Sequence, residues 1–383
     1  MGTLHVAVVG KGLIGSAAAR HLAEAGNEVT LIGPDEPAAF RSHPGVFAAH
    51  YDAARITRVL DRDAHWAGWA AASISRYAEL ESATGLKFHH PLGFMVAAAL
   101  GSDLIPAMEQ AGRAFGVIAQ ADAAHPFHLM PGTEARLESA PAGFIDPRRM
   151  VQAQTLAAAN AGARVVRQPV WALREEGALV RCILDDGSEV RTDRVLVCAG
   201  AFSAPVGLVP GMPLNAQGRI VLLARVAPEL VERWARMPAL IRVDPHADLP
   251  DIYLLPPVRY ADGHHYIKIG TGSIDHPLDD LTSLQEWYRL GGVGSDPERL
   301  HASLVALLPE LADAEVRTDA CAVTMTPSGY PIIDWVAPGR IAVACGGNGK
   351  AAKSADELGR LAALWVTESV STDDFPEVLR APR

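Results

Sequence analysis

The stretch that decides the fold is residues 5–15, which read HVAVVGKGLIG. His5–Val9 is a short apolar run that ends at a glycine, as is typical of a strand buried on both faces. The alanine-rich segment Ser16–Ala25 predicts a helix that stops at Gly26, and Glu28–Ile32 predicts a second strand. This strand–helix–strand opening predicts a parallel sheet with helices on its faces.

Gly10, Gly12 and Gly15 form a GxGxxG pattern between the first strand and the helix. The three glycines permit a tight turn, close approach of the backbone to a pyrophosphate, and close packing of helix on strand. The pyrophosphate then lies at the helix N-terminus, where free N–H groups and the helix dipole favour anions. Leu13 and Ile14 belong to the same turn and are expected to contact the same ligand. The pattern predicts a Rossmann-like dinucleotide-binding domain.

The acid that usually binds a ribose hydroxyl at the end of the second strand is missing. Gly33 occupies that place, and Asp35 and Glu36 follow it. We take Asp35 as the candidate ribose ligand. A glycine there can also admit a 2′-phosphate with Arg41 as its partner, so this motif alone leaves an NADP-dependent dehydrogenase open.

Composition narrows the class of protein but does not choose the activity. The 383 residues are 49% hydrophobic and 20% charged, with a net charge of −10, which excludes a disordered chain or a disulfide scaffold. The acidic balance, without a basic run, argues against nucleic acid or an anionic membrane as partner. No apolar run reaches the roughly 18 residues of a membrane span, and no signal sequence is apparent, so we expect a cytoplasmic location.

A second motif lies at residues 186–203, which read DGSEVRTDRVLVCAGAFS and predict a hairpin, a strand and a turn at Ala199 and Gly200. Together with the GxGxxG pattern, this resembles the double signature of FAD-binding amine oxidoreductases. More specifically, the chain resembles the sarcosine-oxidase-like branch of the D-amino-acid oxidase superfamily. That branch includes N-methyl amino acid, pipecolate and fructosyl-amine oxidases.

Further segments resemble this branch in order and nearly in spacing. They are Ser42-His43, the ARITR segment at 54–58, the GFIDP segment at 143–147, Lys268-Ile-Gly270, the RTDAC segment at 317–321, and Gly346-Gly-Asn-Gly349. The resemblance implies an α/β protein with an α+β substrate domain. A Rossmann-like FAD-binding domain, residues 1–90, 144–215 and 320–383, is interleaved with a mixed-sheet substrate domain, residues 91–143 and 216–319.

The resemblance also implies roles for three reactive side chains. Lys268 would be a buried lysine near the flavin N5 whose charge favours electron transfer to oxygen. Arg55 would lie beside the flavin, and Cys321 would bond covalently to it. From the residues alone, Lys268 can be interpreted as a lysine on an exposed strand face, and Cys321 can be interpreted as a small buried hydrophobic residue. The remaining cofactor contacts implied are Ser42, His43, Val170, Ala199, Gly200, Gly346, Gly347, Asn348, Gly349 and Lys350.

The substrate site departs from the branch. Arg58 is the candidate for a substrate carboxylate, because its planar fork matches that group. Arg55 and Arg58 are three residues apart, so they share a face if the segment is helical. The usual lysine after the glycine turn is replaced by Ala351, with Lys350 and Lys353 on either side.

The pocket histidine of the branch is replaced by Gly272, and its two pocket tyrosines by Leu254 and Val323. These replacements predict a roomier and less polar pocket than one shaped for sarcosine. No metal-ligand spacing is present, so no metal is expected.

We therefore predict an FAD-dependent amine oxidase, acting on a secondary amine or an N-substituted amino acid and reducing O2 to H2O2. The alternatives are a dehydrogenase that passes electrons to a quinone or carrier, the NADP-dependent enzyme, and a non-catalytic flavin-binding subunit. The expected partners are a small-molecule substrate and oxygen, in a monomer or homodimer.

Overall fold

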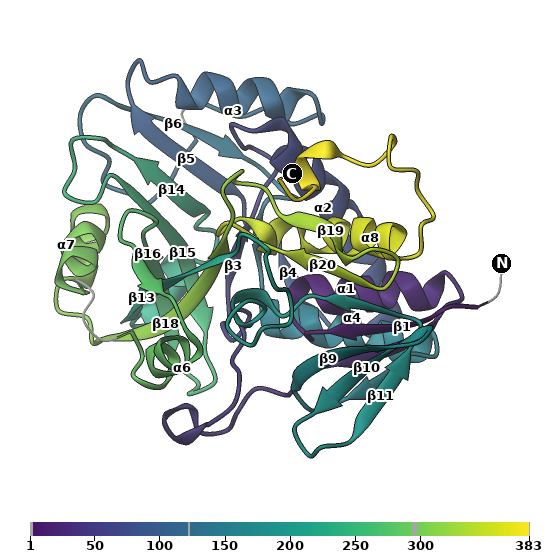
Figure 1. The fold of residues 1–383 in the computed structure, drawn as a ribbon. Coiled ribbons are helices and arrows are strands. Elements are labelled where there is room, and N and C mark those ends of the chain that lie inside the picture. The colour runs from purple at the N-terminus through teal and green to yellow at the C-terminus, as the bar shows by residue number, and fades with distance from the viewer. Residues whose placement is uncertain (1–2, 122, 293–296, 383) are drawn as a thin grey trace.

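A six-stranded sheet forms one half of the protein (Figure 1). The structure is a computed structural model that describes residues 3–121, 123–292 and 297–382. The strand order is β19-β20-β12-β1-β2-β8, in which all neighbours are parallel except β19 and β20. The bounds are β1 His5–Val9, β2 Glu28–Ile32, β8 Arg164–Val166, β12 Arg194–Val197, β19 Ile332–Ala337 and β20 Ile341–Cys345.

Helices cover one face of this sheet and a small sheet covers the other. Val6 and Val8 of β1 pack in one core with α1 and α8, whereas Ala7 and Val9 pack in another with the three-stranded sheet. A Cβ atom on Gly359 would lie 2.6 Å from the Cβ of Ala17, so small residues let α1 and α8 approach closely. The elements are α1 Leu13–Glu24, α2 Ala64–Thr84, α4 Pro147–Asn160, α8 Ala355–Val366, β9 Val170–Glu176, β10 Leu179–Leu184 and β11 Glu189–Thr192.

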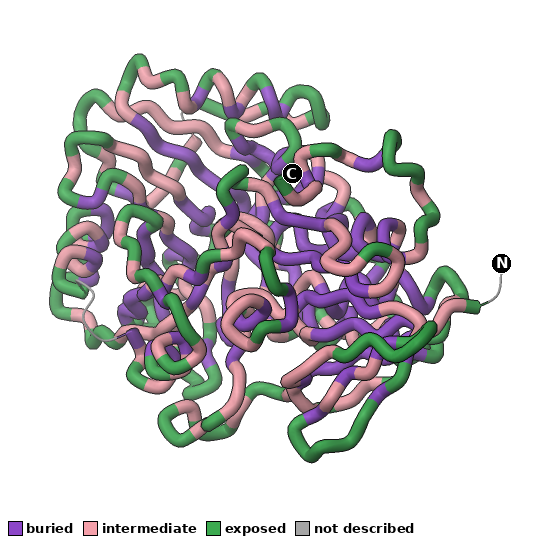
Figure 2. The backbone as a smooth tube through the Cα atoms, viewed as in Figure 1, coloured by how far each residue is buried: buried purple, intermediate pink, exposed green. Residues whose placement is uncertain are grey.

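The other half is a mixed eight-stranded sheet. Its order is β17-β13-β16-β15-β14-β5-β6, and β18 also pairs with β13. Strand β13 pairs with β17 over residues 216–218, with β16 over residues 221–225, and with β18 over residues 215–224. Its strands are β5 Phe94–Ala99, β6 Thr133–Glu138, β13 Asn215–Arg225, β14 Ala239–Val243, β15 Asp251–Arg259, β16 His265–Gly270, β17 His276–Leu278 and β18 Val316–Met325. Its helices are α3 Leu104–Arg113, α5 Pro228–Arg233, α6 Leu281–Arg289 and α7 Pro297–Leu307. Figure 2 shows buried backbone running through both halves.

A fourth, small sheet joins β3 Arg55–Thr57, β7 Gly143–Ile145 and β4 His89–His90. Arg55 and Arg58 therefore belong to a strand and its end, and the helical face considered for them is wrong. In an extended chain the side chains of neighbouring positions alternate, and these two arginines make separate sets of contacts.

The predicted fold class is confirmed, as are the elements that open the chain. Helix α2 begins at Ala64, because Asp63 caps it by accepting from the backbone N–H groups of His65 and Trp66 at 2.9 and 3.1 Å. The domain boundaries stay a prediction, and residues 1–2 and 383 of the outer ranges lie outside the described residues. The boundary at 320 falls inside β18, which pairs with β13 on both sides of it.

Candidate active site

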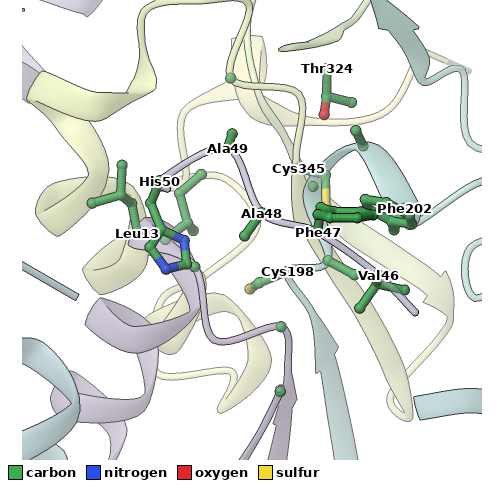
Figure 3. A pocket seen from close by; sticks show the side chains of 18 of the residues that line it. Leu13, Val46, Phe47, Ala48, Ala49, His50, Cys198, Phe202, Thr324 and Cys345 are labelled. Atoms are coloured by element: carbon green, nitrogen blue, oxygen red, sulfur yellow. The ribbon is translucent and has the colours of Figure 1, made fainter. Parts of the chain in front are cut away.

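A large cavity lies between the two halves of the protein (Figure 3). It extends from the carboxyl ends of β1 and β2 in the parallel sheet to strand β18 of the mixed sheet. The predicted site residues that line it are Gly10, Gly12, Leu13, Ile14, Arg55, Val170, Ala199, Gly200, Cys321, Val323, Gly346, Gly347 and Gly349. Its length and its start at the glycine turn suit a dinucleotide.

The three glycines of the first turn have different surroundings. A Cβ on Gly10 would lie 2.4 Å from the carbonyl oxygen of Cys198, and one on Gly15 would lie 1.9 Å from that of Gly10. A Cβ on Gly12 would meet only His50 Nδ1, at 3.9 Å, so its free side faces the cavity. Gly12 is the N-cap of α1 and offers no side-chain cap, which leaves N–H groups at this end for an anion. Gly15 serves the packing and does not line the cavity.

Gly33 is explained by the approach of the glycine turn. A Cβ there would lie 2.6 Å from the backbone nitrogen of Lys11, so a larger residue would displace the turn. Asp35 lies outside the cavity lining, where its carboxylate pairs with Lys11 and, at 3.0 Å, with Arg167. The structure does not bring Asp35 into the cavity, and Gly33 with Pro34 forms the wall at this end.

The loop before β3 lines the cavity at a different point from the one expected. Ser42 and His43 lie outside the lining, and His43 makes local contacts, with Nε2 3.1 Å from the carbonyl oxygen of Val46. His50 lines the cavity instead, beside Leu13 in Figure 3. Its Nδ1 is buried without a hydrogen-bond partner, and burial lowers its pKa to about 3, so the ring is neutral. The sequence signal for His50 was its position five residues before Arg55, which the match to the Ser-His dipeptide obscured.

The Asp52 cluster, made of Asp52, Arg55 and Lys268, lies behind one end of the cavity. Lys268 is 1% exposed, and its Nζ donates to Asp52 Oδ2 at 2.6 Å and to the carbonyl oxygen of Ala54. Arg55 pairs with the same carboxylate oxygen and donates to the carbonyl oxygen of Ala49 at 3.0 Å. Arg55 lines the cavity, whereas Lys268 lies behind it.

Cys321 is the partly exposed member of the four cysteines. It lies on β18 at the cavity wall, and its Sγ accepts from Arg55 Nη2 at 3.4 Å. Cys198 and Cys345 also line the cavity, but both are buried and burial raises the pKa of each thiol. Cys321 is therefore the thiol of the cavity with solvent access and a cation beside it.

The glycine turn at 346–349 closes the cavity beyond β20. Asn348 is at φ 49° and anchors the turn, because its Nδ2 donates to the carbonyl oxygen of Gly346 at 2.6 Å and its Oδ1 accepts from the N–H of Thr326 at 3.0 Å. The side chain of Asn348 thus supports the turn and does not line the cavity. A 3-10 turn, Ala351–Ser354, separates Gly349 from α8, so the helix begins at Ala355, six residues after Gly349.

The Asp61 cluster, made of Arg58, Asp61 and Lys353, forms a second buried group of charges. Asp61 Oδ2 is 2.8 Å from Lys353 Nζ and 3.3 Å from Arg58 Nη1. Lys350 Nζ is 3.8 Å from Asp61 Oδ1 and 5.8 Å from the ring centroid of Trp66. Burial and then the charge of Arg58 lower the pKa of Lys353 to about 7. Burial acts to raise the pKa of Asp61, but Lys353 and Arg58 outweigh it and lower that pKa.

Arg58 and Lys350 do not line the cavity, and neither does Leu254. Leu254 pairs with Ile269 and is fully buried in the core on the α7 side of the mixed sheet. Tyr253 faces the other way: a Cβ on Gly270 would lie 2.4 Å from its hydroxyl oxygen. Tyr253 thus shares the face of Lys268, but like Leu254 it does not line the cavity. Strand alternation contained the signal, because Leu254 pairs with Ile269 and therefore cannot share the face of Lys268.

The described residues show neither a metal site nor a membrane helix. No group of three or more His, Cys, Asp or Glu side chains among them is placed to hold a metal ion. No helix in the described ranges is long and apolar enough to cross a membrane.

Solved structures with the same fold include several amine and amino acid oxidases. NikD, an amino acid oxidase of nikkomycin biosynthesis, is 18% identical with a TM-score of 0.76, and the match covers 100% of this chain and 98% of that one. Fructosyl amine oxidase (Amadoriase I) from Aspergillus fumigatus is 19% identical, with a TM-score of 0.74 and coverage of 99% and 89%. Glycine oxidase from Geobacillus kaustophilus is 18% identical, with a TM-score of 0.72 and coverage of 100% and 99%.

Sequence comparison identifies the family. The comparison with curated proteins gave no significant match. The family described as DAO, FAD dependent oxidoreductase, matches residues 5–365, which span both halves of the protein and the cavity between them. The chain therefore belongs to the DAO family of FAD-dependent oxidoreductases.

Proposed function

We propose that the protein oxidises the C–N bond of an amine or amino acid, a secondary amine or N-substituted amino acid, and transfers the electrons to O2. The amine loses two electrons and two protons to give an imine, which water hydrolyses, and O2 gains both to give H2O2. The observation that carries the proposal is the Asp52 cluster: the buried Lys268 and the partly exposed Arg55 lie at the end of the cofactor cavity, where charge on reduced oxygen needs stabilisation.

The cavity suits FAD on the evidence of its own walls. The glycine turn is open at Gly12, and His50 presents a buried nitrogen without a protein partner. When bound, FAD supplies the two-electron chemistry, so the chain needs to bind, orient and set charges. Arg55 holds a positive charge at the wall beside Cys321, and Lys268 holds a second charge behind it.

The Asp61 cluster supports a substrate with an anionic group. It contains the buried Lys353, the partly buried Arg58 and one carboxylate, and Lys350 adds a further cation nearby. Glu138 is also within reach of these charges, but burial raises its pKa and so disfavours its charge. A substrate carboxylate would offset part of this excess positive charge. Val323 on the cavity wall would leave an apolar space for the substituent on nitrogen.

Two features of the proposal have separate tests. A purified protein with a flavin spectrum whose colour stays in the pellet after acid precipitation would show attachment through Cys321; a colourless pellet would contradict that bond. An anaerobic screen of secondary amines and N-substituted amino acids, followed by loss of flavin absorbance, then identifies the substrate class.

Peroxide yield in air separates the oxidase from its alternative. With a substrate from the screen, an oxidase forms one H2O2 for each amine oxidised. Slow peroxide formation combined with rapid reduction of a quinone would instead support the dehydrogenase. A yellow protein that no amine reduces would contradict both.

A further inference from the structure

Asp52 is a buried carboxylate with no role in the proposal above, although it contacts two of its principal residues. It is 6% exposed, and each of its oxygens has two partners. Oδ2 accepts from Lys268 Nζ at 2.6 Å and pairs with Arg55. Oδ1 accepts from the N–H of Ala53 at 2.7 Å and from the hydroxyl of Tyr260 at 3.1 Å. Its capacity as an acceptor is therefore committed within the protein.

The charge balance around Lys268 depends on this carboxylate. A buried lysine tends to lose its proton, and here burial and then the charge of Arg55 push its pKa well below the usual value. Two other groups act to raise this pKa, Cys321 and Asp319, both on β18. Neither contacts Lys268 as Asp52 does, and burial raises the pKa of Asp319, which disfavours its charge. Asp52 opposes the loss, because its carboxylate contacts the ammonium directly.

The remaining groups around Lys268 do not replace Asp52. Tyr253 on β15 and Tyr260 are buried, and burial raises the pKa of both phenols, so they stay neutral. Arg148 adds a further positive charge that disfavours the ammonium. The carbonyl oxygen of Ala54 accepts a hydrogen bond from Lys268 whether the amine is charged or neutral. The oxygens of Asp52 and Ala54 thus both hold the amine of Lys268 in position, whereas the negative charge in contact with it comes from Asp52.

We propose that Asp52 is a positioning residue that keeps Lys268 in its charged form behind the cavity, holds the guanidinium of Arg55 at the cavity wall, and so sets the rate of reaction with oxygen. The inference rests on the proposed role of Lys268 and deepens it. It also links the oxygen side to the cofactor attachment side, because Arg55 joins Asp52 to Cys321. A structural role alone would affect folding without changing the pH dependence of reoxidation.

The first test compares Asp52→Asn with Tyr260→Phe. The asparagine keeps the shape but removes the charge, and its single oxygen can accept from only one of the two pairs of donors around Asp52. The phenylalanine removes one donor to the same carboxylate and leaves the charge. We expect Asp52→Asn to slow flavin reoxidation at pH 8 by at least about tenfold, the effect of one pKa unit on Lys268, with anaerobic reduction by the amine within about twofold. The fall of the reoxidation rate with rising pH should move to lower pH by at least about one unit. Tyr260→Phe should change neither property by as much.

The second test does not need turnover. Thermal unfolding of wild type, Asp52→Asn, Lys268→Met and the double variant gives a cycle that measures the coupling of the pair. We expect Asp52→Asn to lower the melting temperature clearly in wild type and less in the Lys268→Met background, because the second background has no buried ammonium to leave unpaired. Asp52→Glu, which keeps the charge, should restore part of the reoxidation rate and covers the case in which Asp52→Asn does not fold.

The outcomes separate this inference from the proposed function. If Lys268→Met reoxidises normally, the role of Lys268 fails, while coupling in the unfolding cycle still decides whether Asp52 stabilises its charge. If Lys268→Met is slow but Asp52→Asn has an unchanged pH profile or equal effects in both backgrounds, the role of Asp52 is overturned.

Discussion

The Asp52 cluster and the Asp61 cluster flank the same short strand, β3, with similar components. In each, an aspartate lies three residues from an arginine and receives a lysine from a distant segment, at 2.6 Å for Lys268 and 2.8 Å for Lys353. They differ in their surroundings. The Asp52 cluster reaches the cavity wall through Arg55, whereas Arg58 of the Asp61 cluster does not line the cavity. The Asp61 cluster has Lys350 as an additional cation.

The difference teaches how one arrangement can serve two purposes. In the Asp52 cluster each carboxylate oxygen has two partners, which suits a permanent charge. Both clusters pair two cations with one aspartate, but the Asp61 cluster has Lys350 as a third cation. Arg58 Nη1 is also buried there, and it forms an ion pair with Asp61 but no hydrogen bond. An excess of buried donors and charge suits an anionic ligand. The two clusters should therefore respond differently to substitution.

The largest expected effect is on the oxygen side. Lys268→Met should slow flavin reoxidation by about 10²–10³-fold, the usual loss when one preorganised charge or donor is removed, and leave reduction by the amine almost unchanged. Stopped-flow measurement of the two half-reactions checks this. Lys350→Met, which removes a lysine from the edge of the other cluster, is the control. Equal slowing of both half-reactions by Lys268→Met would remove the distinction between the clusters.

The next effect is on substrate binding at the Asp61 cluster. Arg58→Met should lower kcat/KM for a carboxylate-containing amine by about 10–100-fold, because a charged hydrogen bond contributes about 1.5–3 kcal/mol. The same variant should change little with an analogue that lacks the carboxylate. Steady-state kinetics with the matched pair of amines measures the difference. A similar loss with both amines would mean that Arg58 does not bind the carboxylate.

A smaller effect should appear in the pH dependence of binding. Lys353, with a pKa of about 7, is charged below that pH and neutral above it. Affinity for an anionic substrate should therefore weaken as pH rises through about 7, by up to about tenfold for each further unit. Anaerobic titration between pH 6 and 9 measures it, and Lys353→Met should remove this part of the dependence. A dependence that persists in the variant would assign it to the substrate amine.

The smallest effect on rates is expected at Cys321. Cys321→Ser should abolish flavin retention in the acid-precipitated pellet and still bind FAD, because the glycine turn and the rest of the cavity remain. Cys345→Ser, at a buried thiol of the same cavity, is the control and should keep the retention. Colour that stays in the pellet of Cys321→Ser would place the bond elsewhere or exclude it.

The local patterns predicted the elements well. His5–Val9 and Glu28–Ile32 are strands as expected. The signal for them is local, because a short apolar run bounded by glycine already indicates a buried strand. The conformation at Arg55–Arg58 was not predictable from spacing, since β3 exists by pairing Arg55 with Ile145, 90 positions away in the sequence. The nearby acidic residues also differ in role, because Asp61 pairs with Arg58 whereas Asp63 caps α2.

The site was less predictable because its contacts join distant segments. Nothing near Lys268 in the sequence indicates Asp52, and the two meet only when β16 lies against the loop before β3. His50 and Tyr253 were not predicted for a different reason. The prediction matched short segments to the family by residue type, whereas the position in the fold decides which way a side chain faces. A shift of one residue in a strand moves a side chain to the opposite face, which is what separates Leu254 from Tyr253.

Strand β3 has a consequence for how this enzyme can change. One short backbone segment carries members of both clusters, because ten consecutive residues include Asp52, Arg55, Arg58 and Asp61. A displacement of that segment would move the groups proposed for oxygen and those proposed for substrate together. Selection for a new substrate through this segment would then alter reactivity with oxygen as well. Engineering that aims to separate the two properties should instead act on Lys353, Val323 and Tyr253, which come from other strands and turns.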